Sequence, residues 1–237
     1  MPCTNHDCPF FELQAGNGPL LVPDILCMIS DTAQKVTFKQ GETLFLQGQS
    51  SLSLYSLTDG MVKIVSHTPD GREQIVGLSS PGNLLVGLQS LHDKHYAYTG
   101  IAATTVQACK INQRTLLARV NDRTDVAMGL IRAVNAQLVH SRALMEVMGH
   151  KCATSKIASF ILLMTPKSQH SNGRFTLPFS RREMAGLFGL SEETVCRLMA
   201  DLKRAGVIYA PRGSVEIRDW DQLHAIAGGH SGEHVGA

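Results

Sequence analysis

Short apolar runs separated by turn dipeptides fill much of the first half of the chain. The dipeptides are Asp59-Gly60, Asp70-Gly71 and Pro81-Gly82, each typical of a tight turn. Four runs of strand-like composition accompany them, at residues 43–45, 53–57, 62–65 and 74–78. Closely spaced short strands predict antiparallel β structure, as in a jelly roll or a sandwich.

A helical pattern follows over residues 124–148. Six positions alternate spacings of three and four residues, namely Ile131, Val134, Leu138, Ser141, Met145 and Met148. This spacing predicts one long helix that carries a stripe of the coiled-coil type. The stripe can pack on the β structure or pair with a second helix.

A third pattern begins at Ser180, which is a good N-cap residue. Glu183 lies three residues later and completes a capping box, so a helix is predicted to begin at Arg181. Ala185 is small enough to sit where two crossing helices touch. Gly189 suits a sharp reversal of the chain, because glycine accepts positive φ without steric cost.

A second helix is predicted to begin after Ser191 as N-cap and to stop at Gly206. Val195 and Leu198 lie on its apolar side, and its other side presents Glu193, Cys196 and Arg197. Two apolar runs at residues 207–209 and 215–217 then predict a two-stranded wing. The alternative interpretation is that these are two amphipathic helices of an ordinary protein core. However, the two caps, the small residue at the helix crossing, the turn glycine and the apolar spacing all agree with a helix-turn-helix that binds double-stranded DNA.

Composition and charge add little to this picture. A length of 237 residues suggests two domains, and the net charge is only +2. Between residues 174 and 218 there are eight basic and five acidic residues, a modest excess for contact with DNA phosphates. No secretory pattern begins the chain and the apolar stretch 160–164 is far too short for a membrane span, so a cytoplasmic protein without a membrane segment is expected.

With these motifs, the chain resembles the CRP/FNR family of bacterial transcription regulators, and the resemblance extends over most of its length. Residues 193–197, Glu-Thr-Val-Cys-Arg, resemble that family's recognition helix with its Glu-x-x-(Ser or Gly)-Arg pattern. Arg197 is suited to guanine and Glu193 to the cytosine amino group. Cys196 departs from the pattern and is a weaker donor than serine, so the TTGAT-like half-site of the FNR branch is a provisional assignment.

The resemblance implies an α+β architecture with an N-terminal antiparallel β-roll, a long dimerisation helix and a C-terminal winged helix-turn-helix. It divides the chain into a cysteine-containing tail (1–22), a sensory β-roll (23–120), the dimerisation helix (121–149), the DNA-binding domain (150–222) and a flexible tail (223–237). It implies a homodimer that reads a palindromic site and recruits or blocks RNA polymerase. The residues expected to contact DNA are Arg181, Ser191, Glu193, Thr194, Cys196, Arg197 and Arg212.

The roll is not expected to bind cyclic AMP. Family members that do so use a glutamate and an arginine after the Pro-Gly turn. Between Arg72 and Arg114 this chain has no arginine, and its only acid after Glu73 in that window is Asp93. A buried phosphate needs charge-assisted donors, which this window lacks.

Six cysteines in a cytoplasmic protein favour metal, cluster or redox chemistry over disulfides. Cys3 and Cys8 lie in a polar tail, and Cys109 follows near the end of the roll. In the FNR branch, three N-terminal cysteines and one at this roll position hold an oxygen-sensitive [4Fe-4S] cluster. The resemblance therefore implies Cys3, Cys8 and Cys109 as ligands, with Cys27 as the candidate for the fourth.

Other interpretations of the signal stay open. Cys27 lies among apolar residues and is equally suited to a core position, and His6 offers a mixed Cys/His site. Haem bound by His67 or His92, a small molecule, or thiol redox chemistry without a cluster are further alternatives. An effector-binding module with a degenerate helix-turn-helix is a less favoured alternative, and it would show no salt-dependent DNA binding. An enzyme using Cys109 with a histidine base is the least favoured, because no nucleophile, base and orienting group occur at motif spacing.

Overall fold

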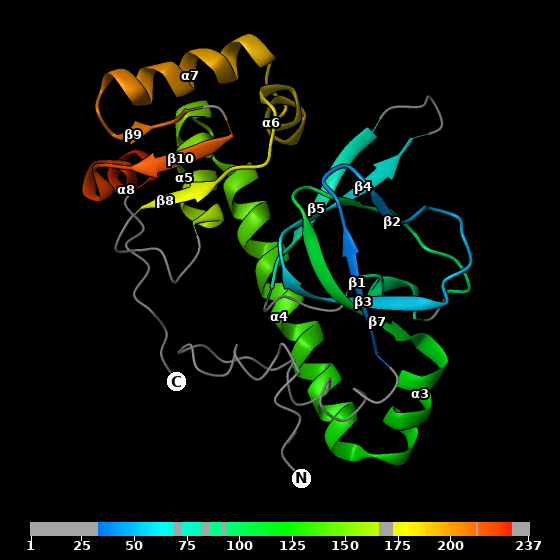
Figure 1. Cartoon of the computed structure of the whole chain (residues 1–237). Coiled ribbons are helices and arrows are strands. Elements are labelled where there is room, and N and C mark those ends of the chain that lie inside the picture. Colours follow the sequence, from blue (N-terminus) through cyan, green and yellow to red (C-terminus); the bar gives the residue numbers. More distant parts are fainter. Residues whose placement is uncertain are drawn as a thin grey trace. The chain divides into compact units, whose positions relative to one another are not determined.

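The computed structural model describes residues 33–68, 73–81, 86–91, 93–165, 173–211 and 213–228, and Figure 1 shows the element order. The chain divides into two compact units, residues 1–141 and 142–237. The β-roll, long helix and winged helix-turn-helix confirm the predicted fold class.

Two antiparallel sheets form the roll. One has the order β1–β7–β3, with β1 at Gln34–Phe38, β7 at Val106–Asn112 and β3 at Ser53–Asp59. The other has the order β2–β6–β4–β5, with β2 at Thr43–Phe45, β6 at Thr99–Ala102, β4 at Val62–His67 and β5 at Glu73–Ser79. The four predicted strands are confirmed as β2 to β5, whereas β1, β6 and β7 were not predicted.

Aromatic rings fill the space between the sheets. The rings of Phe45 and Tyr96 stack with centroids 4.3 Å apart, and the rings of Phe45 and Tyr55 stack with centroids 6.0 Å apart. Gly100 lies directly beneath, because a Cβ atom there would meet the Phe45 ring at 2.6 Å. The interior of the roll is therefore closely packed with side chains.

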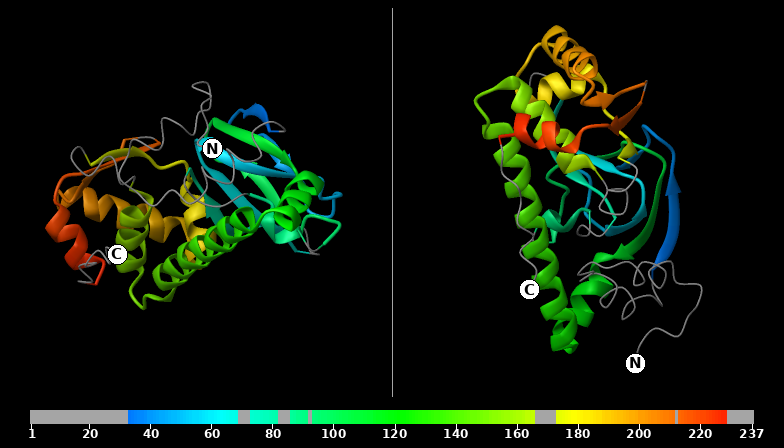
Figure 2. Two further views of the ribbon diagram at one scale, coloured as in Figure 1. Left: turned by 90° about the horizontal axis from the view of Figure 1, so that it is seen from below. Right: turned by 90° about the vertical axis from the view of Figure 1, so that its left-hand side faces the viewer.

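Helices cover the other face of β7. A short 3-10 helix, η2 (Leu88–Ser90), precedes β6, and α3 (Gln113–Asp122) follows β7 directly with Asn112 as N-cap. The long helix α4 (Thr124–Gly149) confirms the helix predicted for residues 124–148 and is continuous in Figure 2. An apolar cluster joins β3, η2, β7, α3 and the first half of α4 and consists of Leu54, Leu88, Cys109, Ile111, Leu116, Val126 and Ala133.

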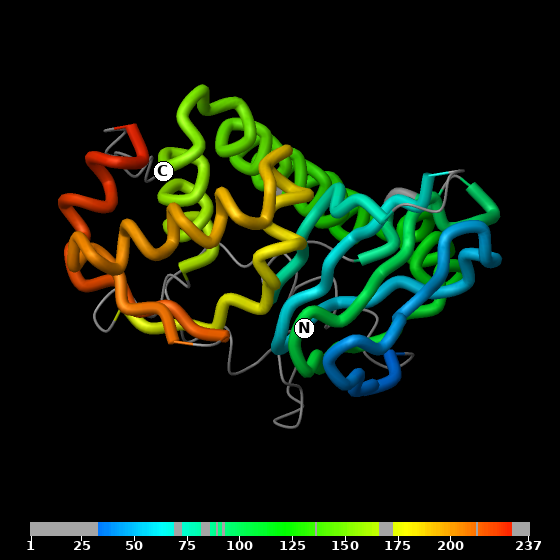
Figure 3. The backbone as a smooth tube through the Cα atoms, turned by 90° about the horizontal axis from the view of Figure 1, so that it is seen from above, coloured from blue at the N-terminus to red at the C-terminus, as the bar shows by residue number. Residues whose placement is uncertain are grey.

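The C-terminal unit is a winged helix-turn-helix, traced in Figure 3 from α5 (yellow-green) to α8 (red). Its helices are α5 (Ala153–Met164), α6 (Arg181–Phe188), α7 (Glu192–Arg204) and α8 (Trp220–Ile226). At its centre, the ring of Phe160 meets those of Phe179 and Phe188 edge-on at 5.5 and 5.2 Å. These contacts anchor α5 to the segment that leads into α6 and to the end of α6.

Two predictions for this unit need correction. The two predicted wing strands are confirmed as β9 (Ile208–Tyr209) and β10 (Ser214–Ile217), which pair with each other, but the sheet also contains a third strand, β8 (Arg174–Thr176), which pairs with β10. The unit also continues past the predicted boundary at residue 222. Asp219 caps α8 by accepting from the Gln222 N–H, and Leu223 is fully buried, so residues 223–226 belong to the folded unit and not to a flexible tail.

Candidate nucleic-acid interface

Local capping sets the start and the end of α6. The Ser180 Oγ accepts from the Glu183 N–H at 3.1 Å, and the Ser180 N–H donates to the Glu183 carboxylate at 2.8 Å. Gly189 ends the helix with φ of 66°. The capping box and the turn glycine are therefore confirmed, and together they fix where the chain enters and leaves α6.

Replacing Ser180 by alanine should lower the free energy of unfolding by about 1 kcal/mol, because it removes the acceptor for the Glu183 N–H. Urea denaturation followed by circular dichroism measures this change. Glu183→Gln is the matched control and should stay close to the wild type, since glutamine also serves in a capping box. Equal losses for the two variants would contradict the role of the Ser180 hydroxyl.

Helix α7 begins with a second cap. The Ser191 Oγ accepts from the Thr194 N–H at 3.1 Å, and the hydroxyls of the same two residues lie 2.8 Å apart. Val195, Met199 and Leu202 are buried on the inner side of α7. The inner side was predicted around Val195 and Leu198, but Leu198 is only half-buried, because the i+4 position, Met199, points more directly inward.

The outer side of α7 carries the predicted reading residues. Glu193, Cys196 and Arg197 are all exposed, as expected, and so is Ala200 one turn beyond Cys196. Within the part of the chain that the structure describes, neither Glu193 nor Arg197 is in an ion pair, whereas Arg204 near the end of α7 pairs with Asp201. Ala200 was not predicted from the sequence as part of this surface. Its i+4 spacing from Cys196 is the one sequence feature that places it on the outer side of α7.

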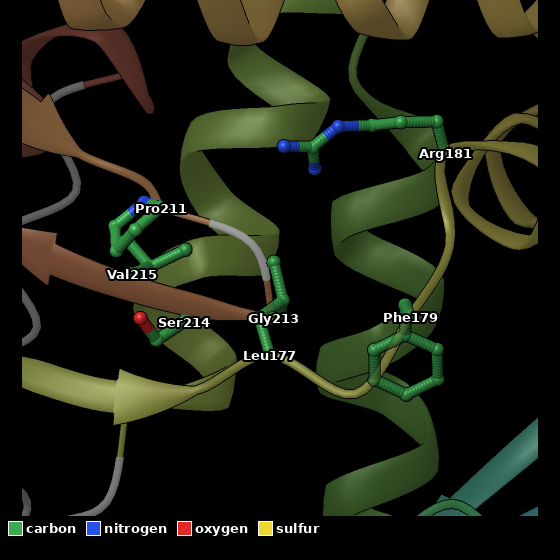
Figure 4. A pocket seen from close by; sticks show the side chains of 7 residues that line it. All are labelled: Leu177, Phe179, Arg181, Pro211, Gly213, Ser214 and Val215. Carbon is green, nitrogen blue, oxygen red and sulfur yellow. The ribbon is translucent and has the colours of Figure 1, made fainter.

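Arg181 lies beside a cavity between the start of α6 and the wing. Figure 4 shows its side chain reaching over this cavity toward the turn that contains Pro211. The volume is about 180 Å³, and the lining residues are Leu177, Phe179, Arg181, Pro211, Gly213, Ser214 and Val215. Arg212, the other predicted contact in this turn, lies outside the described residues.

The predicted cysteine ligands are only partly described. Cys109 is 5% exposed and belongs to the apolar cluster between β7 and the helices, while Cys3, Cys8 and Cys27 lie outside the described residues, as do His6 and His92. The described residues contain no group of three or more His, Cys, Asp or Glu side chains that could hold a metal ion.

The roll offers little space near its aromatic stack. A cavity of about 10 Å³ lies among Phe45, Ile64, Tyr96 and Tyr98. The Nε2 atom of His67 is 3.0 Å from the Thr99 hydroxyl, so this ring nitrogen already has a hydrogen-bond partner. Residues 82–85, which follow the predicted turn at Pro81, lie outside the described residues.

Comparison with known domains and proteins agrees with this geometry. Residues 35–123 match the cyclic nucleotide-binding domain, and residues 155–226 match the Crp-like helix-turn-helix domain. The chain is 31% identical over 194 residues to the transcriptional activator protein FnrA of Stutzerimonas stutzeri, covering 81% of this chain and 79% of that protein. It is 29% identical over 199 residues to the nitrogen fixation regulation protein FixK of Bradyrhizobium diazoefficiens, covering 82% of each.

A solved structure shares the fold. FixK2 from Bradyrhizobium japonicum superposes with a TM-score of 0.72 at 24% identity, covering 82% of this chain and 97% of that one. The fold and the helix-turn-helix define a DNA-binding transcription regulator and not an enzyme. The chain belongs to the CRP/FNR family, and its similarity to FnrA and FixK places it near the FNR-like branch. None of the helices in the described residues is long and apolar enough to cross a membrane.

Proposed function

We propose that this regulator is a cytoplasmic homodimer that binds a palindromic DNA site through α7 and is controlled by a redox or gas signal at its N-terminal unit. DNA binding rests on one observation above all: Glu193 and Arg197 are exposed on the outer side of a helix whose inner side is buried, and neither is in an ion pair with another described residue. Recognition helices contact bases with residues of their N-terminal turns, where both side chains lie.

The proposed DNA contacts divide into two kinds. Glu193, Cys196 and Arg197 face base edges, and Arg181 and Arg212 neutralise phosphates. Ser191 and Thr194 cap the start of α7, where the helix N-terminus favours a phosphate. This division predicts that base preference depends on the outer side of α7 and that salt dependence depends on the arginines around the wing.

The apolar stripe of α4 supports the homodimer. Ile131, Val134, Leu138, Met145 and Met148 are each 39–59% exposed on one helix, and such a contiguous apolar surface is typical of an interface. A dimer also supplies the second recognition helix, which has to reach the next major groove about 34 Å away. Ser141 is exposed within the same stripe and weakens it, which leaves dimerisation open to control.

Cys109 is positioned to pass a signal to α4. Its side chain shares one apolar cluster with Val126 and Ala133 of α4 and with Leu88 of η2. Any ligation or oxidation that moves this thiol changes the packing under the first half of α4, because closely packed interiors transmit displacement. Control of the dimer helix from Cys109 therefore needs no contact between the two units of the chain.

Hydrogen bonds hold η2 against α3 beside the same cluster. The side chain of Gln113 donates to the carbonyls of Ser90 and Leu91 at 3.2 and 3.1 Å, and the hydroxyls of Ser51 and Ser90 lie 2.7 Å apart. All three polar side chains are buried. A satisfied buried network of this kind fixes η2 relative to the helix that leads into α4.

We further propose that the signal acts on a [4Fe-4S] cluster held by Cys3, Cys8, Cys27 and Cys109. Four thiolates are the usual ligand set of such a cluster, and the chain supplies four cysteines besides the exposed Cys152 and Cys196. When bound, the cluster would supply an oxygen-sensitive centre. Cyclic AMP is not part of the proposal, because the sequence between Arg72 and Arg114 contains no arginine to bind its phosphate.

Anaerobic purification followed by an absorption spectrum and iron and sulfide analysis tests the cluster. A brown protein near four irons per chain, bleached by air, supports it. The Cys109→Ser variant should then lose iron and the Cys152→Ser variant should keep it. A colourless, iron-free protein that still binds a palindromic site would remove the cluster and keep the regulator, with thiol oxidation or a small molecule as the signal.

We also propose that the DNA-bound dimer recruits RNA polymerase, and transcription assays test this step. The relatives named as transcriptional activators support recruitment of the polymerase by the bound dimer. We expect transcript from a promoter carrying the selected site to rise only when that site is intact. A fall in transcript would indicate that the bound dimer blocks the polymerase instead.

A further inference from the structure

The outer side of α7 has two chemically different parts. Glu193 and Arg197 carry charge, and Cys196 and Ala200 are small and apolar. All four side chains are exposed, and the spacing of four residues from Cys196 to Ala200 places these two on neighbouring turns of the helix. A DNA duplex against this side of α7 meets a charged part and an apolar part next to each other.

The hydroxyl groups nearest to this surface have partners within the helix. The Ser191 Oγ accepts from the Thr194 N–H, and the hydroxyls of Ser191 and Thr194 lie 2.8 Å apart. Both groups therefore contribute to the cap of α7, which they would have to leave to read a base. The side chains that remain available to contact base edges are therefore those of Glu193, Cys196, Arg197 and Ala200.

The apolar character of the cysteine side chain determines which feature of a base Cys196 and Ala200 can contact. A cysteine side chain behaves as a small hydrophobe with only a weak S–H donor, and alanine has no polar atom. In the major groove, thymine alone among the four bases presents a methyl group, and apolar side chains contact it. We infer that Cys196, together with Ala200, selects a thymine in each half-site through its 5-methyl group, an inference that rests on the proposed function of α7.

Removing the thymine methyl isolates this contact, because deoxyuridine keeps the hydrogen-bonding edge of thymine. The contact corresponds to about 0.8 kcal/mol for a buried group of methyl size, so affinity should fall about fourfold for one half-site. Changing both half-sites of a palindrome should reduce affinity about fifteenfold.

The experiment begins with a palindromic duplex selected by the wild-type protein from random DNA. Each symmetry-related pair of thymines is then replaced by deoxyuridine, and binding is measured by fluorescence anisotropy at one salt concentration. We expect one pair to show the fifteenfold loss. In the Cys196→Ser and Cys196→Gly variants this loss should shrink below threefold, while the Cys152→Ser variant, which also lacks one exposed thiol, should retain it.

The possible results separate the inference from the function on which it rests. Failure to select any palindrome would remove the proposed function itself. Tight binding with no deoxyuridine effect at any position would overturn the methyl contact and leave the regulator in place. A deoxyuridine effect that persists unchanged in both Cys196 variants would assign the methyl contact to another residue.

Discussion

Replacing Leu138 by aspartate should convert the protein to a monomer and weaken binding to its palindromic site more than 100-fold. Leu138 is 45% exposed in the middle of the α4 stripe, where two symmetry-related copies would place two carboxylates against each other. Burial of unpaired charge costs several kcal/mol, and 100-fold corresponds to about 2.7 kcal/mol. A monomer also loses the second half-site altogether.

Val139 supplies the matched control for this change. It is 57% exposed on the same helix but stands one residue away from the stripe, at a position that faces outward when Leu138 is in the seam. The Val139→Asp variant should therefore remain dimeric. Sedimentation velocity reports the oligomeric state and anisotropy the DNA affinity; a Leu138→Asp protein that stays dimeric at micromolar concentration would show that the stripe is not the interface.

The difference between predicted and missed elements follows from the range of the forces that form them. The capping box at Ser180 and the αL turn at Gly189 depend on groups within a few residues, so their pattern is visible in the sequence. Strand β1 exists because it pairs with β7 about seventy residues later, and β8 pairs with β10 about forty residues later. Such strands depend on distant partners and carry weak local patterns.

The candidate site shows the same contrast between pattern and packing. Glu193, Cys196 and Arg197 could be placed on the outer side of α7 from helical periodicity alone. Ala200 was missed because alanine has no functional group that marks it as a reading residue. The boundary at residue 222 was wrong because the glycines and histidines near the end of the chain obscure Leu223, whose burial is decided by tertiary packing.

Replacing Arg197 by alanine should weaken binding to the selected site by about 1–3 kcal/mol per half-site and relax base preference at one position of each half-site. Arg197 is exposed on the outer side of α7 and forms no ion pair within the described residues, so its guanidinium is available for a bidentate contact with guanine. Two such half-sites give about 2 kcal/mol or more on the palindrome, so the expected loss of affinity is at least about thirtyfold.

Arg212→Ala separates base reading from charge. Loss of this wing arginine should weaken selected and random DNA alike and reduce the slope of affinity against salt, because a phosphate contact carries no base information. Anisotropy with both duplexes over a salt series distinguishes the two variants. If Arg197→Ala also lowered both affinities equally, Arg197 would be a phosphate contact, and sequence preference would have to come from Glu193, Cys196 and Ala200.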